Sequence, residues 1–197
     1  MIAIIDVGGN NLASLGNAIA RLGYEFTFTH SKQQLLNASQ VIFPGVGAAA
    51  SGMKALHAYN LIDTVRQLKQ PLLGICLGMQ LLFEHSEEGN VEGLGLLEGS
   101  VKQLKFQPGF PVPHMGWNRL QWKTASFLQP EFSDDYVYFV HSYAAPINNN
   151  TLAACNYTEE FTAVVQKDNI VGMQFHPEKS AAVGLQLLNN FLKRGSL

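Results

Sequence analysis

The sequence contains few cysteines and few charged residues. Cys76 and Cys155 are the two cysteines among 197 residues, which excludes a disulfide framework and makes a reducing cytoplasm the expected location. Charged residues amount to 14%, against ~25% in typical globular domains. The net charge is −2 and basic residues do not cluster, so nucleic acid or an anionic membrane is not expected as the main partner.

Targeting, membrane and metal signals are also missing. No apolar run approaches the ~18 residues that a membrane-spanning helix needs. The first six residues lack a positively charged start and reach an acidic residue at once, so they predict a first strand and not a signal peptide. No C-x-x-C or H-E-x-x-H motif occurs, and the sequence therefore predicts neither a metal nor an organic cofactor.

The hydrophobic residues, 47% of the chain, follow an alternating pattern in residues 1–85. Short apolar runs predict strands at 2–7, 24–29, 41–43 and 72–75, and helical patterns lie at 12–22, 53–56 and 61–68 and begin again at 77. The predicted order is β-α-β-β-α-β-α. We therefore expect an α/β fold with a mixed, largely parallel central sheet covered by helices on both faces.

The second half of the chain has a different pattern. Short strand candidates follow one another at 100–104, 118–122, 136–140, 152–157, 163–166 and 170–174, with a hairpin loop at 167–169 and a final helix at 181–192. We expect these strands to form an antiparallel extension of the same sheet. The whole chain, residues 1–197, is then one domain.

A possible nucleophile lies where the 72–75 strand meets the next helix. Residues 74–78 read Gly-Ile-Cys-Leu-Gly, which is the G-x-nucleophile-x-G elbow pattern with Cys76 in the nucleophile position. The flanking glycines suit a sharp turn that leaves no room for side chains beside the nucleophile. A cysteine with apolar neighbours is also commonly a small buried residue, so the elbow alone leaves both interpretations open.

A base for Cys76 must come from elsewhere in the chain. Of the six histidines, His176 directly follows an apolar strand, and Pro177 keeps it out of a helix. On an extended segment residues two apart point the same way, so Glu178 is expected to orient the imidazole. The plainer alternative is a strand-end histidine beside a polar neighbour. Cys76, His176 and Glu178 together form a candidate catalytic triad.

These segments resemble the class I, or triad-type, glutamine amidotransferases. The likeness rests on residues 74–80 (GICLGMQ), residues 174–178 (QFHPE) and the turn at 44–47 (PGVG), in the same order along the chain. It implies hydrolysis of glutamine to glutamate and ammonia through a Cys thioester, with the ammonia passed to a synthase partner. The backbone N–H groups that stabilise the oxyanion would come from Leu77 and from Val46 or Gly47.

The resemblance also implies residues that hold the glutamine head group: Gly47, Gln80, Glu88, Ser142 and Tyr143. Each has a plainer interpretation. Gln80 is equally a helix-surface residue and Glu88 a solvated acid, whereas Ser142 and Tyr143 follow a strand pattern that packing alone explains.

Within the family, the likeness is greatest to the glutaminase subunits of a two-subunit synthase of histidine biosynthesis. It rests on residues 113–118 (PHMGWN), 139–143 (FVHSY) and 176–180 (HPEKS). It implies a heterodimer with a (β/α)₈-barrel cyclase that contacts Asn11, Ser14, Trp117, Tyr138 and Lys179. A flip of the Gly45–Val46 peptide on partner binding would switch the glutaminase on.

One segment departs from the family, and several alternatives stay open. The first turn reads Asp6-Val7-Gly8-Gly9-Asn10-Asn11, with Val7 in place of the usual tyrosine and Asn10 in place of a glycine. The chain is alternatively the glutaminase of anthranilate or aminodeoxychorismate synthase, or of a sugar-modifying paralogue. Further alternatives are a peptidase-like cysteine hydrolase and a regulatory protein without activity. Cys155 is expected to be buried and inert.

Overall fold

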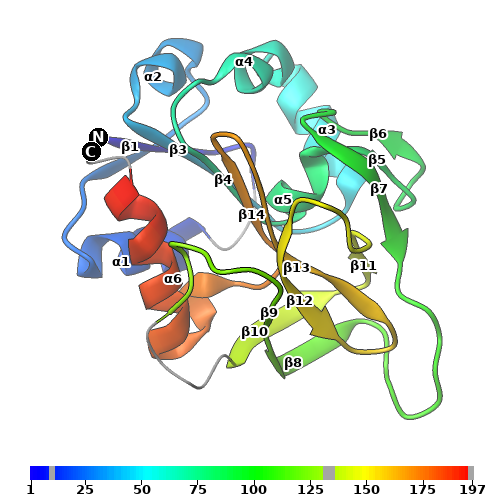
Figure 1. Ribbon diagram of the computed structural model, residues 1–197. Coiled ribbons are helices and arrows are strands. Elements are labelled where there is room, and N and C mark those ends of the chain that lie inside the picture. Colours follow the sequence, from blue (N-terminus) through cyan, green and yellow to red (C-terminus); the bar gives the residue numbers. More distant parts are fainter. Residues whose placement is uncertain (9–11, 131–135, 195–197) are drawn as a thin grey trace.

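The computed structural model of the chain describes residues 1–8, 12–130 and 136–194, and it is built on an eight-stranded sheet (Figure 1). The strand order is β2-β1-β3-β4-β14-β13-β12-β9. The first five are parallel, and the last three are antiparallel to their neighbours. The strands are β1 (Ile2–Ile5), β2 (Phe26–Thr29), β3 (Gln40–Gly45), β4 (Leu72–Cys76), β9 (Gln121–Trp122), β12 (Thr151–Asn156), β13 (Glu160–Lys167) and β14 (Ile170–Met173).

Helices cover both faces of this sheet, as the alternating pattern predicted. Helices α1 (Leu12–Arg21) and α6 (Ala181–Arg194) pack on one face. The other face carries α2 (Lys32–Asn37), α3 (Ala49–Ala58), α4 (Ile62–Gln67) and α5 (Leu77–Leu81). Each face buries its own apolar cluster, so the sheet lies between two hydrophobic cores. The predicted α/β class with a mixed, largely parallel sheet is confirmed.

The remaining strands form two smaller sheets, which corrects the expected single antiparallel extension. Strands β8 (His114–Arg119) and β10 (Tyr136–His141) pair with each other. A four-stranded sheet has the order β11-β7-β5-β6, with β5 (Phe83–Ser86), β6 (Val91–Glu92), β7 (Leu97–Gln103) and β11 (Tyr143–Ala144). Only β13, β12 and β9 extend the main sheet. The predicted strand at 118–122 is divided at buried Leu120, because the chain changes sheets there.

Five short elements were not predicted: α2, β5, β6, β11 and the 3₁₀ turn η1 (Pro177–Lys179). Helix α2 has six residues and buries only Leu35, too few for a recognisable apolar stripe. The Ser31 hydroxyl accepts a hydrogen bond from the N–H of Gln34 and caps this helix. Because α2 connects β2 to β3, both strands run parallel to β1, one on each side of it. The predicted hairpin at 167–169 is confirmed, with Asp168 at φ 53°.

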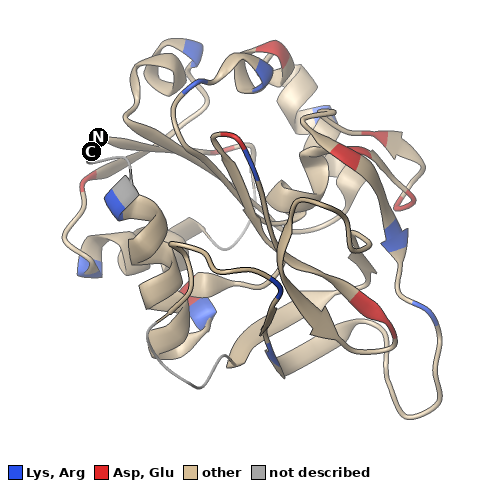
Figure 2. Ribbon diagram, viewed as in Figure 1, with Lys and Arg blue, Asp and Glu red and all other residues tan. Residues whose placement is uncertain are grey.

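The parallel strands bring the predicted functional segments to one edge. The turn at 44–47, the Cys76 elbow and His176 all follow the carboxyl ends of neighbouring strands β3, β4 and β14. Charged residues are spread over helices, turns and strand ends, while the middle of the main sheet carries few of them (Figure 2). Within the described residues, no helix is both long and apolar enough to cross a membrane.

Candidate active site

Cys76 lies at the predicted sharp turn between β4 and α5. Its backbone has φ 53° and ψ −114°, a conformation that L-residues rarely adopt. The flanking glycines are required by close packing. A Cβ on Gly78 would lie 1.8 Å from the carbonyl oxygen of Phe43, and one on Gly74 would lie 2.7 Å from the Cα of Met79. The elbow therefore holds Cys76 in a strained position against strand β3.

His176 and Glu178 form a buried pair directly after β14. The Nδ1 atom of His176 lies 2.9 Å from Oε1 of Glu178, and the two side chains are 4% and 3% exposed. The predicted contact is present, but the expected extended segment is wrong. Residues Pro177–Lys179 form a 3₁₀ turn, η1, and only His176 itself is extended, at φ −99° and ψ 98°. The turn brings the carboxylate back to the ring.

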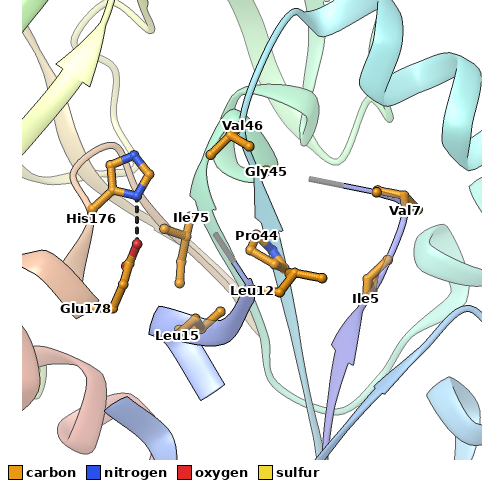
Figure 3. Close-up of a pocket in the computed structure, with 11 residues that line it drawn as sticks. Ile5, Val7, Leu12, Leu15, Pro44, Gly45, Val46, Ile75, His176 and Glu178 are labelled. Carbon is orange, nitrogen blue, oxygen red and sulfur yellow. Dashed lines mark hydrogen bonds and ion pairs between the residues drawn. The ribbon is translucent and has the colours of Figure 1, made fainter. Parts of the chain in front are cut away.

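The charge state of His176 depends on this pair and on the elbow. Burial lowers the pKa of His176, but Cys76 and Glu178 together outweigh it and raise the pKa to about 10. The ring therefore carries protons on both nitrogens near neutral pH. One proton is donated to Glu178, and the second nitrogen, Nε2, points away from that carboxylate (Figure 3). Nε2 is buried and has no hydrogen-bond partner among the described residues.

Cys76 and His176 line the same cleft, which has a volume of about 270 Å³. Every residue that the sequence placed at the oxyanion or around the glutamine head group lines it too: Val46, Gly47, Leu77, Gln80, Glu88, Ser142 and Tyr143. The structure therefore brings together residues from α5, from the turns after β3 and β5, and from the start of β11 with the residue before it. Sequence reasoning missed Pro113, Val140 and His141, which also line the cleft.

The candidate oxyanion donors lie beside the nucleophile. Leu77 is the first residue of α5, where backbone N–H groups have no acceptor within the helix. The side chain of Val46 is 40% exposed, and Gly47 has φ 96° with open space around its Cα. Gly45 differs, because a Cβ there would lie 2.9 Å from the backbone nitrogen of Gly78. The turn is thus tightly packed at Gly45 and open at Gly47.

Gln80 and Glu88 are held by hydrogen bonds within the cleft wall. Gln80 is buried and donates from Nε2 to the Tyr143 carbonyl at 2.7 Å and to Gln174 Oε1 at 3.0 Å. The helix-surface alternative for Gln80 is therefore wrong. Glu88 accepts a 2.7 Å hydrogen bond from the N–H of Ala49, the first residue of α3. Since Ala48 provides no side-chain cap, Glu88 caps this helix from another part of the chain.

Gln174, which lies near the sulfur, and His141, which lines the cleft, were not predicted as site residues. Cys76 Sγ lies 3.9 Å from the Val140 carbonyl oxygen and 3.9 Å from Nε2 of Gln174. His141 is the second histidine of the cleft, but both of its nitrogens are already bonded, Nδ1 to the Tyr143 carbonyl and Nε2 to His114. His176 is thus the cleft histidine with a nitrogen available. Two sequence signals include His141: the alternation along β10 and the segment 139–143 that resembles the family.

A smaller apolar cavity of about 20 Å³ lies on the other side of His176 (Figure 3). Its walls come from α1 and from the ends of β1, β3 and β4, and Glu178 contributes the carboxylate. Val46 and His176 line both this cavity and the larger cleft, whereas Cys76 lines only the cleft. These two side chains therefore stand between the two spaces.

The predicted partner contacts lie on one side of this site. Ser14 and Lys179 are exposed, on α1 and η1, and both α1 and β10 pack against η1. Trp117 of β8 and Tyr138 of β10 are directly paired, with their ring centroids 6.1 Å apart, and Trp117 is 53% exposed. Asn11 lies outside the described residues, as do Gly9 and Asn10 of the unusual first turn.

Among the described residues, neither the second cysteine nor a metal-binding group provides another reactive centre. Cys155 is buried, as predicted, and burial raises its pKa to about 12. In the described part of the chain, no three His, Cys, Asp or Glu side chains are grouped so that they could hold a metal ion.

The family model and two similar known proteins agree on one family. The model of the family "Glutamine amidotransferase class-I" matches residues 3–194. The chain is 61% identical over 193 residues to "imidazole glycerol phosphate synthase subunit HisH 2" of Legionella pneumophila subsp. pneumophila strain Philadelphia 1, covering 98% of this chain and 97% of that protein. It is 51% identical over 195 residues to "imidazole glycerol phosphate synthase subunit HisH" of Xanthomonas campestris pv. campestris strain 8004, covering 98% and 96%.

Solved structures share the fold at lower identity. A crystal structure of a glutamine amidotransferase superposes with a TM-score of 0.77 at 20% identity, covering 100% of this chain and 99% of that one. A chain of the PurLQS structure from Thermotoga maritima superposes with a TM-score of 0.73 at 17% identity, covering 98% of this chain and 97% of that one.

Proposed function

This chain belongs to the class-I glutamine amidotransferase family, and we propose that it is the glutaminase subunit of an imidazole glycerol phosphate synthase. It hydrolyses glutamine to glutamate and ammonia and supplies the ammonia to histidine biosynthesis. One observation carries this proposal: Cys76 and His176 line the same cleft, and Glu178 holds the far side of the imidazole. The near full-length identity to synthase subunits supports the choice of synthase.

Cys76, His176 and Glu178 act as the catalytic triad. The Cys76 sulfur attacks the side-chain amide carbon of glutamine, and a thioester forms as the carbon–nitrogen bond breaks. His176 gives its Nε2 proton to the leaving nitrogen, which departs as ammonia. His176 then takes a proton from water, whose oxygen attacks the thioester and releases glutamate. Glu178 keeps the proton of Nδ1 in place and stabilises the charged ring, as its 2.9 Å hydrogen bond indicates.

The cleft walls stabilise the oxyanion and hold the substrate. The N–H of Leu77 and that of Val46 or Gly47 receive the negative oxygen of the tetrahedral intermediate. Removing one such donor typically costs ~2.7–4 kcal/mol in the transition state. Gly47, Gln80, Glu88, Ser142 and Tyr143 surround the glutamine head group. Support for these roles comes from their common position around Cys76.

The subunit works in a heterodimer with a (β/α)₈-barrel cyclase that consumes the ammonia. The face formed by Ser14, Trp117, Tyr138 and Lys179 binds this partner, together with Asn11. Three observations support it: the face adjoins the triad through η1, it presents two paired aromatic side chains, and Trp117 is half exposed although large. Residues 1–197 act as one domain, supported by the family match over 3–194. The cytoplasmic location stays a prediction.

The turn at 44–47 prevents the free subunit from wasting ammonia. On partner binding the Gly45–Val46 peptide flips and turns an N–H toward the cleft. The exposed Val46 side chain and the open space at Gly47 leave room for this change. Glutamine hydrolysis should therefore be slow for the free chain and fast in the complex. Equal rates with and without the barrel would exclude the switch.

The decisive experiment reconstitutes the chain with the cyclase barrel from the same genome. Ammonia release from glutamine tests the glutaminase, and formation of imidazole glycerol phosphate from the ribonucleotide substrate tests the synthase. If ammonia is released but no imidazole product forms, the chain serves another acceptor, as in the chorismate-using synthases or a sugar-modifying paralogue. Absence of any ammonia release in the complex would overturn the proposal.

A further inference from the structure

Two buried histidines next to the cleft have no role in the triad chemistry. His114 of β8 and His141 of β10 are 3% and 6% exposed. Nδ1 of His114 lies 3.1 Å from Nε2 of His141, and their strands pair at these positions. Two polar rings in such a buried place are costly to keep unless each nitrogen is satisfied.

Hydrogen bonds at the two ends fix where every proton lies. The Tyr143 carbonyl, 2.9 Å from His141 Nδ1, can only accept, so Nδ1 of His141 carries the proton. Nε2 of the same ring then accepts from Nδ1–H of His114. Nε2 of His114 in turn accepts from the amide of Asn118, 3.3 Å away. The chain of bonds thus runs in one direction from Asn118 to Tyr143.

The surroundings keep both rings neutral and oriented. Burial lowers the pKa of His114 to about 4, and burial, with smaller contributions from His114 and His176, lowers that of His141 to about 3. His114 is stacked between Phe139 and Tyr157, with centroid separations of 4.9 and 4.0 Å. A proton added to His141 would place a second donor against His114 Nδ1–H. The pair can therefore exist in only one tautomeric arrangement.

The hydrogen bonds that run through His114 and His141 end at the Tyr143 carbonyl, in the wall of the cleft. The Tyr143 carbonyl receives His141 Nδ1–H and, on its other side, the Gln80 amide at 2.7 Å. Gln80 is bonded to Gln174, whose amide lies beside the Cys76 sulfur. A single carbonyl with two donors thus joins the buried pair to the side chains around the nucleophile.

We propose that His114 and His141 are positioning residues: their directed hydrogen bonds fix the Tyr143 carbonyl and thereby the Ser142–Tyr143 wall and Gln80 against glutamine. This inference rests on the proposed glutaminase function. We call the hydrogen bonds that run from Asn118 through His114 and His141 to the Tyr143 carbonyl the relay. Because the relay holds groups that bind the substrate and not the reacting atoms, its loss raises KM much more than it lowers kcat.

The outer end of the relay gives a sharper test than deletion. In Asn118→Asp a carboxylate, which cannot donate, faces His114 Nε2. Because burial disfavours the charged form of His114, the ring stays neutral and carries its one proton on Nε2, so that its bare Nδ1 no longer donates to His141. The change reverses the bond between residues 118 and 114 and removes the bond between the two rings, without altering the size of either ring. His141→Phe instead removes both bonds at the inner end and keeps an aromatic ring.

Glutamine hydrolysis should be measured in the complex with the cyclase barrel. His141→Phe should raise KM about 10-fold, because the Tyr143 carbonyl loses one of its two donors and the buried Nδ1–H of His114 loses its acceptor. Asn118→Asp should raise KM in the native background but have no further effect on the His141→Phe variant. The control is Tyr157→Phe, which keeps the stack on His114 and loses only the hydroxyl bond to the Pro111 carbonyl. It should leave KM unchanged.

A second readout does not depend on activity. ¹⁵N-resolved NMR of the imidazoles should find Nδ1–H and bare Nε2 in both His114 and His141 at pH 7, and Asn118→Asp should move the His114 proton to Nε2. Three results would overturn the relay. The first is a proton on Nε2 of His141 in the native chain, and the second is an unchanged KM in variants that fold. The third is a KM in the double variant that equals the product of the two single effects. If the native complex releases no ammonia, the proposed function fails, while the NMR result still decides the hydrogen-bond direction.

Discussion

Ser180 accepts a 2.9 Å hydrogen bond from the backbone N–H of Tyr138, and its hydroxyl also donates to the His176 carbonyl at 2.6 Å. The turn that carries His176 is thereby fastened to strand β10. The His176 N–H, bonded to the Tyr138 carbonyl at 3.0 Å, makes the same connection from the other direction. The position of the imidazole thus depends on a strand outside the main sheet.

Replacing Ser180 with Ala should therefore lower both stability and activity. The Tyr138 N–H loses its acceptor in a partly buried place, which should reduce the free energy of unfolding by ~1–3 kcal/mol. Urea unfolding measures this loss, and the kcat for glutamine hydrolysis should fall because His176 is less firmly held. Ser180→Cys, nearly the same size, is the control and should lose less. Native stability in Ser180→Ala would contradict the role of this hydroxyl.

Cys76 should oppose stability while it enables catalysis. Its backbone lies where only glycine is comfortable, at a cost of ~1–3 kcal/mol for other residues. Cys76→Gly should relieve this strain, and Cys76→Ala should keep it, while both variants release no ammonia. We expect the glycine variant to be more stable than the alanine variant in denaturant unfolding by ~1 kcal/mol. The reverse order would show that the elbow is unstrained.

Glu178→Gln should change the pH dependence of the reaction. Burial lowers the pKa of His176, and Cys76 and Glu178 raise it to about 10, so removing the carboxylate should lower it. The pH at which His176 loses its second proton then moves down, and the alkaline limb of kcat/KM follows. We expect the rate to fall about 100-fold or more. NMR titration of His176 measures the shift, and an unchanged titration would refute the pairing.

Glu88 should affect stability and substrate binding together. It caps α3 through the Ala49 N–H and lines the cleft, so Glu88→Ala should destabilise by ~1 kcal/mol and raise KM for glutamine. Glu87→Ala is a matched control, because Glu87 accepts a 2.9 Å bond from the Gln103 N–H but does not line the cleft. The control should keep the native KM. A raised KM in both variants would point to a general loosening of this loop.

The buried histidine pair should make the fold sensitive to mild acid. The pKa values of His114 and His141 lie near 4 and 3 in the folded chain, below 6.5 in the unfolded chain, so unfolding takes up protons below about pH 6. Stability then falls with decreasing pH by ~1.4 kcal/mol per pH unit for each ring. His176 is protonated in both states in this range and adds no slope. His141→Phe should halve the slope measured by urea unfolding between pH 6 and 4.5.

Sequence patterns sufficed where local chemistry determines the structure. The apolar runs of β1, β3, β4 and β14 are continuous because both faces of these strands are buried, and the glycines around Cys76 mark the elbow directly. The pairing of β8 with β10 was not predictable in this way. Which strands share a sheet depends on contacts across the chain, and the change of sheet at Leu120 leaves no local signal.

The site was predictable in part for the same reason. His176 and Glu178 are two residues apart, so their contact followed from the sequence even though the 3₁₀ turn did not. His141 lines the cleft and Gln174 lies beside the Cys76 sulfur, and hydrogen bonds hold them to partners 27 and 94 positions away, His114 and Gln80. No periodicity reports such a contact. His141 and Gln174 are recognised as site residues because they are buried polar side chains, and their burial is known only from the fold.

A Cβ at Gly78 would lie only 1.8 Å from the Phe43 carbonyl oxygen, and this clash limits how the sequence of this enzyme can diverge. Position 78 cannot vary by itself, since any replacement displaces β3, and β3 leads directly into the turn at 44–47. The elbow and the turn at 44–47 are therefore constrained to change together during evolution. This keeps the distance from the Cys76 sulfur to the oxyanion donors constant. Laboratory libraries that seek a new ammonia acceptor should leave both segments fixed and randomise the face around Trp117.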